Sequence, residues 1–74
     1  MPRYRVILVH TTAAAMRGEA VLNRAGLGVK LIPVPRNLSS DCGLAIRIAA
    51  QDREQALTVL ARERVEIAGV HDME

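Results

Sequence analysis

The chain has 74 residues and a net charge of +2; half of its residues are hydrophobic, but Tyr4 is its only aromatic residue apart from the histidines. This length predicts a single domain over residues 1–74, whose light aliphatic core is consistent with a homodimer. The composition excludes a membrane protein, because no run approaches the roughly 18 apolar residues of a membrane span. No signal peptide is visible and the single cysteine suits a reducing compartment, so we expect a soluble, cytoplasmic protein.

The first half of the chain predicts a strand, a helix and a second strand. Residues 4–9 form a short, β-branched apolar run that is typical of a buried strand. Thr11 and Thr12 can cap a helix over residues 13–25, which are good helix formers, and residues 29–32 follow as a strand. The apolar stripe of this helix is expected at Met16, Ala20 and Val21.

The second half begins with a polar loop over residues 34–41. Residues 44–49 alternate between large apolar and other side chains, which predicts a half-buried strand. Asp52 and Gln55 have the spacing of a capping box and predict the start of a second helix. Residues 66–70 predict the last strand.

The resulting order, βαββαβ, predicts a ferredoxin-like α+β sandwich of two layers, with an antiparallel sheet in the order 4-1-3-2. We expect no nucleic-acid partner, because RNA-binding domains of this kind stack bases on sheet aromatics and only Tyr4 is available. The sheet face without helices is expected to be apolar enough to contact a partner or a second copy. That open face is predicted to carry Ile7, Val9, Ala45, Arg47, Ala68 and Val70.

The topology predicts where the single cysteine lies. The C-terminal end of the first strand, the N-terminus of the first helix and the start of the third strand share one edge of such a sheet. Cys42, just before the third strand, should therefore face His10, Thr11 and Thr12. His71 should lie at the opposite end.

This position suits thiol chemistry at Cys42. The thiolate is the reactive form of cysteine, and a helix N-terminus or a nearby cation favours it. Arg36 can supply positive charge, the hydroxyl groups of Ser39 and Ser40 are further donors, and Gly43 leaves room beside the sulfur and permits unusual dihedrals. The set suits a nucleophile or a carrier of a terminal sulfur or selenium atom, and lacks the base and orienting acid of a thiol hydrolase.

A structural role for Cys42 is the alternative interpretation. Cys42 shares its parity with Leu44, Ile46 and Ile48, so its side chain can equally point into the core as a small hydrophobic group. With one cysteine and two separated histidines, no spacing typical of zinc ligands exists, and we expect no metal.

Two segments resemble a known family. Residues 31–36 (LIPVPR) and 38–43 (LSSDCG) resemble the small bacterial domains described as putative selenium/sulfur (Se/S) carrier protein-like. Residues 9–12 resemble the strand-to-helix junction of that family, and residues 52–57 resemble the start of its second helix. The Pro-Arg…Ser-Ser-x-Cys-Gly pattern is the specific part of the resemblance.

The resemblance implies a carrier rather than an enzyme. Cys42 would hold a persulfide or selenide, with no other cofactor, and would exchange it with donor and acceptor proteins. The family pattern leads us to expect a small residue such as serine at position 41, and Asp41 departs from it. Two other functions stay open: a small-anion-binding or regulatory module that uses Arg36, Thr12 and the helix N-terminus, and an accessory subunit that pairs through the open sheet face.

Overall fold

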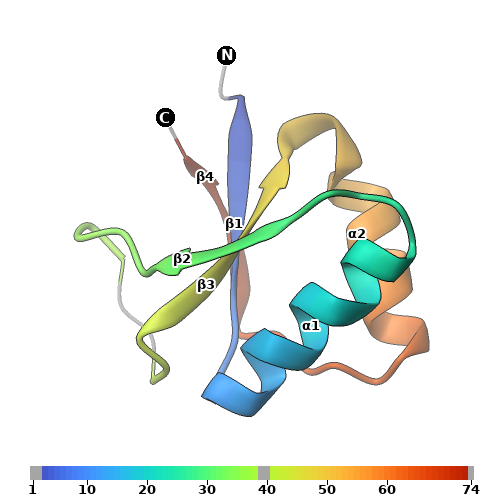
Figure 1. The fold of residues 1–74 in the computed structure, drawn as a ribbon. Coiled ribbons are helices and arrows are strands. Elements are labelled where there is room, and N and C mark those ends of the chain that lie inside the picture. The colour runs from blue at the N-terminus through green and yellow to red at the C-terminus, as the bar shows by residue number, and fades with distance from the viewer. Residues whose placement is uncertain (1–2, 39–40, 74) are drawn as a thin grey trace.

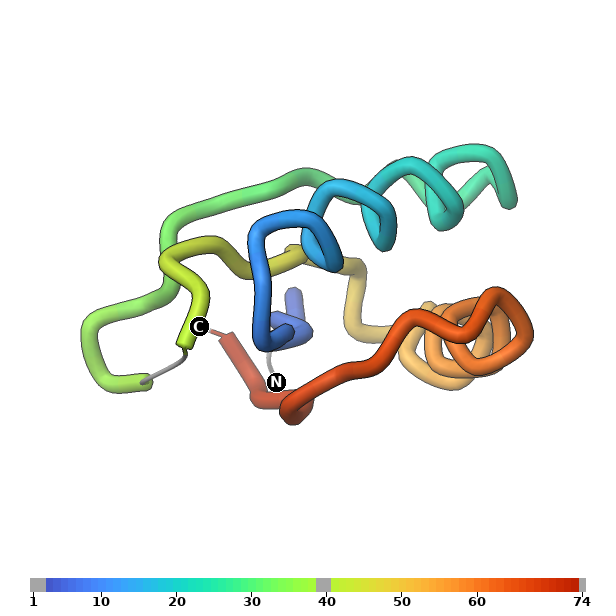
Figure 2. Tube along the Cα trace, turned by 90° about the horizontal axis from the view of Figure 1, so that it is seen from below, coloured from blue at the N-terminus to red at the C-terminus, as the bar shows by residue number. Residues whose placement is uncertain are grey.

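The computed structural model describes residues 3–38 and 41–73. Its elements are β1 (Tyr4–Leu8), α1 (Thr12–Arg24), β2 (Lys30–Pro33), β3 (Leu44–Ala49), the 3-10 helix η1 (Ala50–Asp52), α2 (Arg53–Arg62) and β4 (Gly69–Met73) (Figure 1). The sheet is antiparallel throughout and its order is β2-β3-β1-β4, which is the predicted order read from the other edge. Both helices lie on the same side of the sheet (Figure 2).

The main core lies between this sheet and the two helices. Its largest members are almost inaccessible to solvent, at 0 or 1% exposure: Ile7, Leu22, Ile46, Ile48 and Leu60. Neither helix among the described residues is long and apolar enough to cross a membrane.

The predicted apolar stripe of α1 is largely wrong. Met16 is 59% exposed and Ala20 is also exposed, and of the three predicted residues only Val21 is buried. The helix instead buries Ala15, Gly18, Val21 and Leu22. Small residues at the contact let the helix axis approach the sheet closely, and a stripe that contains glycine and alanine is hard to recognise by hydrophobicity alone.

Both faces of β1 are buried, which explains why its orientation was predicted wrongly. In the register of the sheet, Ile7 lies opposite Ile46, and both belong to the core under the helices. Val9 and Val70 also face the helices and are not on the open face as predicted. Residues 6–9 are all buried, so the strand shows no alternation from which its parity could be read.

The second face of the sheet carries Ala45 and Arg47, as predicted, with Val6 and Leu8 beside them. It is not fully open, because Val6 and Ala45 are 0% exposed. The apolar side chains packed over this face are Ile32, Val34, Leu38 and Met73. The chain after β2 therefore folds across the sheet and forms a small second core; Ala68 is exposed and lies before β4.

The start of α2 differs from the capping-box prediction. Asp52 belongs to η1, which leads directly into α2, and its side chain makes no capping hydrogen bond. Its backbone (φ −93, ψ 5) is not extended, whereas a capping residue usually is.

β4 begins at Gly69, three residues later than predicted. Val65 is buried and Ile67 packs against the core, so this part of the chain crosses from α2 to the sheet edge before it pairs. Pairing starts where the N–H group of Ala68 donates to the carbonyl of Leu8 at 2.6 Å. The apolar pattern of residues 66–70 thus indicated a segment that packs against the core, but not where the strand begins.

α1 ends in a Schellman motif. Gly26 has a positive φ of 89, and its N–H group donates to the carbonyl of Asn23 at 2.9 Å. The N–H group of Leu27 donates to the carbonyl of Leu22 at 3.1 Å. These two hydrogen bonds satisfy carbonyls at the helix end, and glycine adopts the left-handed conformation without steric cost.

α2 ends in the same way, but with an arginine at the left-handed position. Arg64 has φ 59; its N–H group donates to the carbonyl of Ala61 at 3.1 Å, and Val65 donates to Leu60 at 2.9 Å. The left-handed conformation is unfavourable for residues that have a Cβ atom. This helix end is therefore strained where the first is not.

We expect Arg64→Gly to stabilise the protein by about 0.5–1 kcal/mol, because relief of the left-handed strain exceeds the extra chain entropy of glycine in the unfolded state. Urea unfolding followed by circular dichroism measures the change. Gly26→Ala is the matched control at the end of α1 and should lower stability. A lower urea midpoint for Arg64→Gly than for the parent would contradict the assigned helix end.

Candidate functional site

Cys42 is buried at the start of β3. The residue is 4% exposed and belongs to the core under the helices, on the same side as Ile46 and Ile48. Of the two orientations that the sequence left open, the inward one is found. The thiol is therefore shielded from solvent in the folded chain.

Among the residues that the structure describes, Thr12 and Leu44 each bring a polar group to the sulfur atom. The hydroxyl Oγ1 of Thr12 lies 3.7 Å from Sγ, and the N–H group of Leu44 donates to Sγ at 3.4 Å. Thr12 is the first residue of α1, so the sulfur lies at the N-terminus of that helix, where the topology predicted it. A sulfur atom with negative charge would accept hydrogen bonds from both groups, and the positive end of the helix dipole favours such a charge.

Thr11 builds this helix end rather than contacting the sulfur. It is extended (φ −137, ψ 155), and its hydroxyl accepts a hydrogen bond from the N–H group of Ala14 at 3.0 Å. This is the usual geometry of an N-cap threonine. Thr11 thus ends the extended segment from β1 and fixes the place where Thr12 begins the helix.

His10 and Asp41 join the two chain segments at the surface. Nδ1 of His10 lies 3.1 Å from Oδ2 of Asp41, and the two side chains are 48% and 79% exposed. The turn that carries Cys42 therefore contacts the junction between β1 and α1 at two points: His10 with Asp41 at the surface, and Thr12 with Cys42 in the interior. Sequence reasoning missed the pairing, although it placed His10 and Cys42 at the same sheet edge.

The remaining predicted residues contribute less. Arg36 is exposed in the turn closed by the hydrogen bond from Leu38 to Pro35, and no ion pair within the described part of the chain involves it. Gly43 does not have a positive φ, and a Cβ atom built there would meet no described atom within 4 Å. Neither an unusual dihedral nor close packing requires glycine at this position, contrary to expectation. Ser39 and Ser40 lie outside the described residues.

The prediction that His71 lies at the end of the sheet opposite Cys42 is wrong. His71 lies in the middle of β4, opposite Val6, and is exposed. The later start of β4 accounts for the difference, because it moves His71 from beyond the strand into its centre. Within residues 3–38 and 41–73, no group of three or more His, Cys, Asp or Glu side chains is arranged to hold a metal ion.

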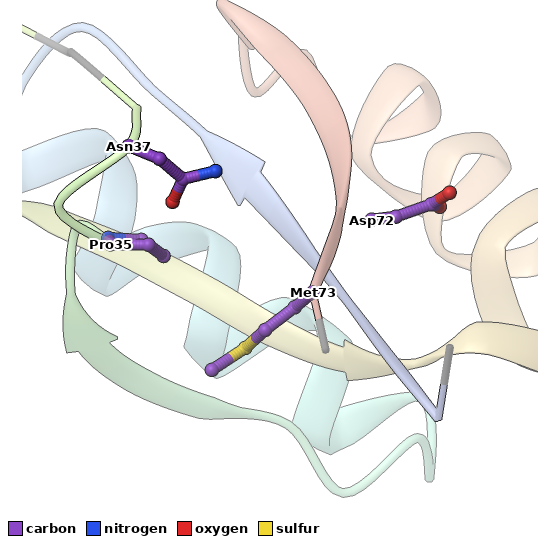
Figure 3. Close-up of a pocket in the computed structure, with 4 residues that line it drawn as sticks. All are labelled: Pro35, Asn37, Asp72 and Met73. Carbon is purple, nitrogen blue, oxygen red and sulfur yellow. The ribbon is translucent and has the colours of Figure 1, made fainter. Parts of the chain in front are cut away.

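A hollow of about 340 Å³ lies between the loop after β2 and the end of β4 and is lined by Pro35, Asn37, Asp72 and Met73 (Figure 3). Met73 pairs with Tyr4, at the start of β1, whereas Cys42 lies beside the residues that follow the end of β1. Asp72 points away from the loop and forms an ion pair with Arg5 at 2.6 Å. The lining contains neither Arg36 nor Thr12, so it gives no support to the predicted anion site.

Comparison with known proteins agrees with the resemblance seen in the sequence. Residues 4–72 match the family model described as "Putative Se/S carrier protein-like", which leaves only the two ends of the chain outside the match. No curated protein and no solved structure matches the chain. The chain therefore belongs to the Se/S carrier protein-like family.

Proposed function

We propose that this protein is a sulfur or selenium carrier in which Cys42 holds the transferred atom for exchange between a donor and an acceptor protein. The observation that carries the proposal is the position of Sγ at the first residue of α1, with the Thr12 hydroxyl and the Leu44 N–H group in contact with it. Membership of the family supports the same conclusion. The proposal includes a ferredoxin-like fold, which the βαββαβ order and the antiparallel sheet support.

The transfer step needs no oxidant or reductant. Sγ of Cys42, as a thiolate, attacks the outer sulfur of a persulfide on the donor protein. A new S–S bond forms to Cys42 while the S–S bond of the donor breaks, and the donor cysteine leaves as a thiolate that takes up the proton lost by Cys42. An acceptor thiolate attacks the outer sulfur on Cys42 in the same way and regenerates the thiol. A selenium atom bound to a donor cysteine moves by the same exchange.

Burial of Cys42 controls both how the carrier is loaded and how the transferred atom is protected. Because Cys42 is only 4% exposed, loading requires the turn at residues 41–43 to shift far enough to admit a donor sulfur to Sγ, which stays at the N-terminus of α1. Once that turn has closed again, the transferred atom is shielded from thiols in solution. Shielding of this kind suits a protein that must deliver a reactive sulfur or selenium atom to one acceptor.

Loading of Cys42 tests the proposal directly. The reduced protein is incubated with a bacterial cysteine desulfurase and cysteine, and its intact mass is recorded beside that of Cys42→Ala. We expect the parent alone to gain the mass of one sulfur atom, which a reductant removes. Equal gain by both proteins, or no gain by the parent from any persulfide donor, would overturn the carrier function.

We further expect Thr12→Val to slow loading about fivefold, since one hydrogen bond to the reacting sulfur is worth on the order of 1 kcal/mol. Valine keeps the shape of threonine but cannot donate to the sulfur. Thr12→Ser keeps the hydroxyl and is the matched control, with a rate near that of the parent. The measurement is the initial rate of mass gain; equal rates for Val and Ser would show that the hydroxyl has no part in loading.

A further inference from the structure

The solvent-facing side of α1 carries an unusual side chain. Met16 is 59% exposed and is, with Tyr4 at 36%, one of two large apolar side chains exposed among the described residues. Ala13 and Ala20, three residues before it and four after it, are exposed as well. We call the exposed surface formed by Thr12, Ala13, Met16 and Ala20 the Met16 ridge.

The Met16 ridge begins at the carrier site. Thr12 and Met16 are four residues apart and so lie on the same side of the helix, about 6 Å apart along its axis. Oγ1 of Thr12 is the atom that lies 3.7 Å from Sγ of Cys42. One end of the ridge, Thr12, therefore contacts the sulfur directly.

A protein whose interface is centred on Cys42 would cover this ridge. A specific protein interface buries roughly 800 Å² on each partner, which corresponds to a disc of roughly 16 Å radius. Met16 lies well within that distance of the sulfur because only one helical turn separates it from Thr12. Methionine is flexible and polarisable, and suits a surface that must fit both a donor and an acceptor.

The charges around the ridge indicate the chemistry of the partner. Arg24 and Arg17 are exposed on α1, Arg17 with Glu63 at 3.9 Å, whereas Glu19, the only acidic residue of this helix, is half-buried. A partner surface with an apolar pocket for Met16 and carboxylates at its rim would complement this arrangement.

We propose that the Met16 ridge is the docking surface for the enzyme that holds the transferred sulfur or selenium atom on its own cysteine. The inference rests on the carrier function proposed for Cys42 and adds the surface through which that function is reached. The occupant is a donor enzyme with an apolar pocket and an acidic rim, not a second copy of this chain.

The test compares two routes of loading. The parent and Met16→Glu are loaded either by a bacterial cysteine desulfurase with cysteine, or by glutathione persulfide, which is small enough to need no docking surface. We expect the ratio of the enzyme-driven rate to the glutathione-persulfide rate to fall at least tenfold in Met16→Glu. Ala61→Glu, which adds the same charge at an exposed position of α2, is the matched control and should keep the ratio of the parent.

The outcomes separate the two proposals. If glutathione persulfide and the enzyme both fail to load Cys42, the carrier function itself fails. If glutathione persulfide loads Cys42 but the enzyme-driven rates of the parent and Met16→Glu are equal, the docking surface is overturned and the carrier function stands. If sedimentation shows a dimer of the parent that Met16→Glu dissociates, the ridge joins two copies of the chain and the docking surface is again overturned.

Discussion

Gly18→Val is expected to lower the free energy of unfolding by about 1–3 kcal/mol or more, a large share of the stability of so small a domain. A Cβ atom at Gly18 would lie 2.6 Å from Cδ1 of Ile46 and 3.5 Å from Cδ2 of Leu60. Both of these side chains are buried, at 0% and 1% exposure, so neither can turn out to solvent. The first carbon atom added already overlaps Ile46, and valine adds two more carbon atoms at the contact between α1 and β3.

Overpacking of this kind costs about 1–3 kcal/mol or more, while the better helix propensity of valine returns only a few tenths of a kcal/mol. A domain this small has a total stability on the order of 5 kcal/mol. Urea unfolding followed by circular dichroism measures the loss. Ala20→Val, at an exposed position of the same helix, is the matched control and should change stability by less than about 0.5 kcal/mol. Equal midpoints for the two variants would mean that Gly18 does not face the sheet.

Cys42 is expected to react with iodoacetamide roughly a hundredfold more slowly in the folded protein than in the unfolded chain, because an opening of about 3 kcal/mol must come first. The physical reason is burial, since Cys42 is only 4% exposed and both Thr12 and Leu44 contact its sulfur. The rate of mass gain in buffer, compared with the rate in concentrated urea, measures the protection.

The dependence of this rate on low concentrations of urea identifies the opening. A local movement of residues 41–43 exposes little surface, so the rate should hardly change with urea below the unfolding transition. His10→Ala, which removes the surface contact with Asp41, should raise the rate by up to about fivefold, as expected for an exposed pair. A rate that rises with urea as steeply as global unfolding would mean that only complete unfolding exposes the thiol, which contradicts a carrier function.

The topology could be predicted because it depends on the order of the elements and on the alternation of large apolar and other side chains in β3. Residues 44–49 alternate and lie in β3 with the predicted parity. Antiparallel pairing then requires the start of β3 to meet the start of α1, which is why the contact between Cys42 and Thr12 could be predicted without coordinates. Long-range neighbours follow from topology when the elements are short and regular.

Other features depend on packing that has no local signal. The parity of β1 was hidden because residues 6–9 are buried on both sides. The left-handed residue that ends α2 is Arg64, where a glycine would have marked the helix end and the later start of β4. The inward orientation of Cys42 and the contact of His10 with Asp41 depend on side-chain positions that parity alone leaves open.

The two border strands show how the chain avoids sheet-to-sheet aggregation. β2 has only four residues; it begins with a lysine, Lys30, and ends with Pro33, which has no N–H group to offer to another strand. β4 carries His71 and Asp72, and Asp72 is held by Arg5 of the neighbouring strand. Short, charged borders are poor templates for a strand from another molecule. Both edges of the four-stranded sheet therefore resist extension by a strand from another molecule, so the fold carries its own protection against edge-to-edge association.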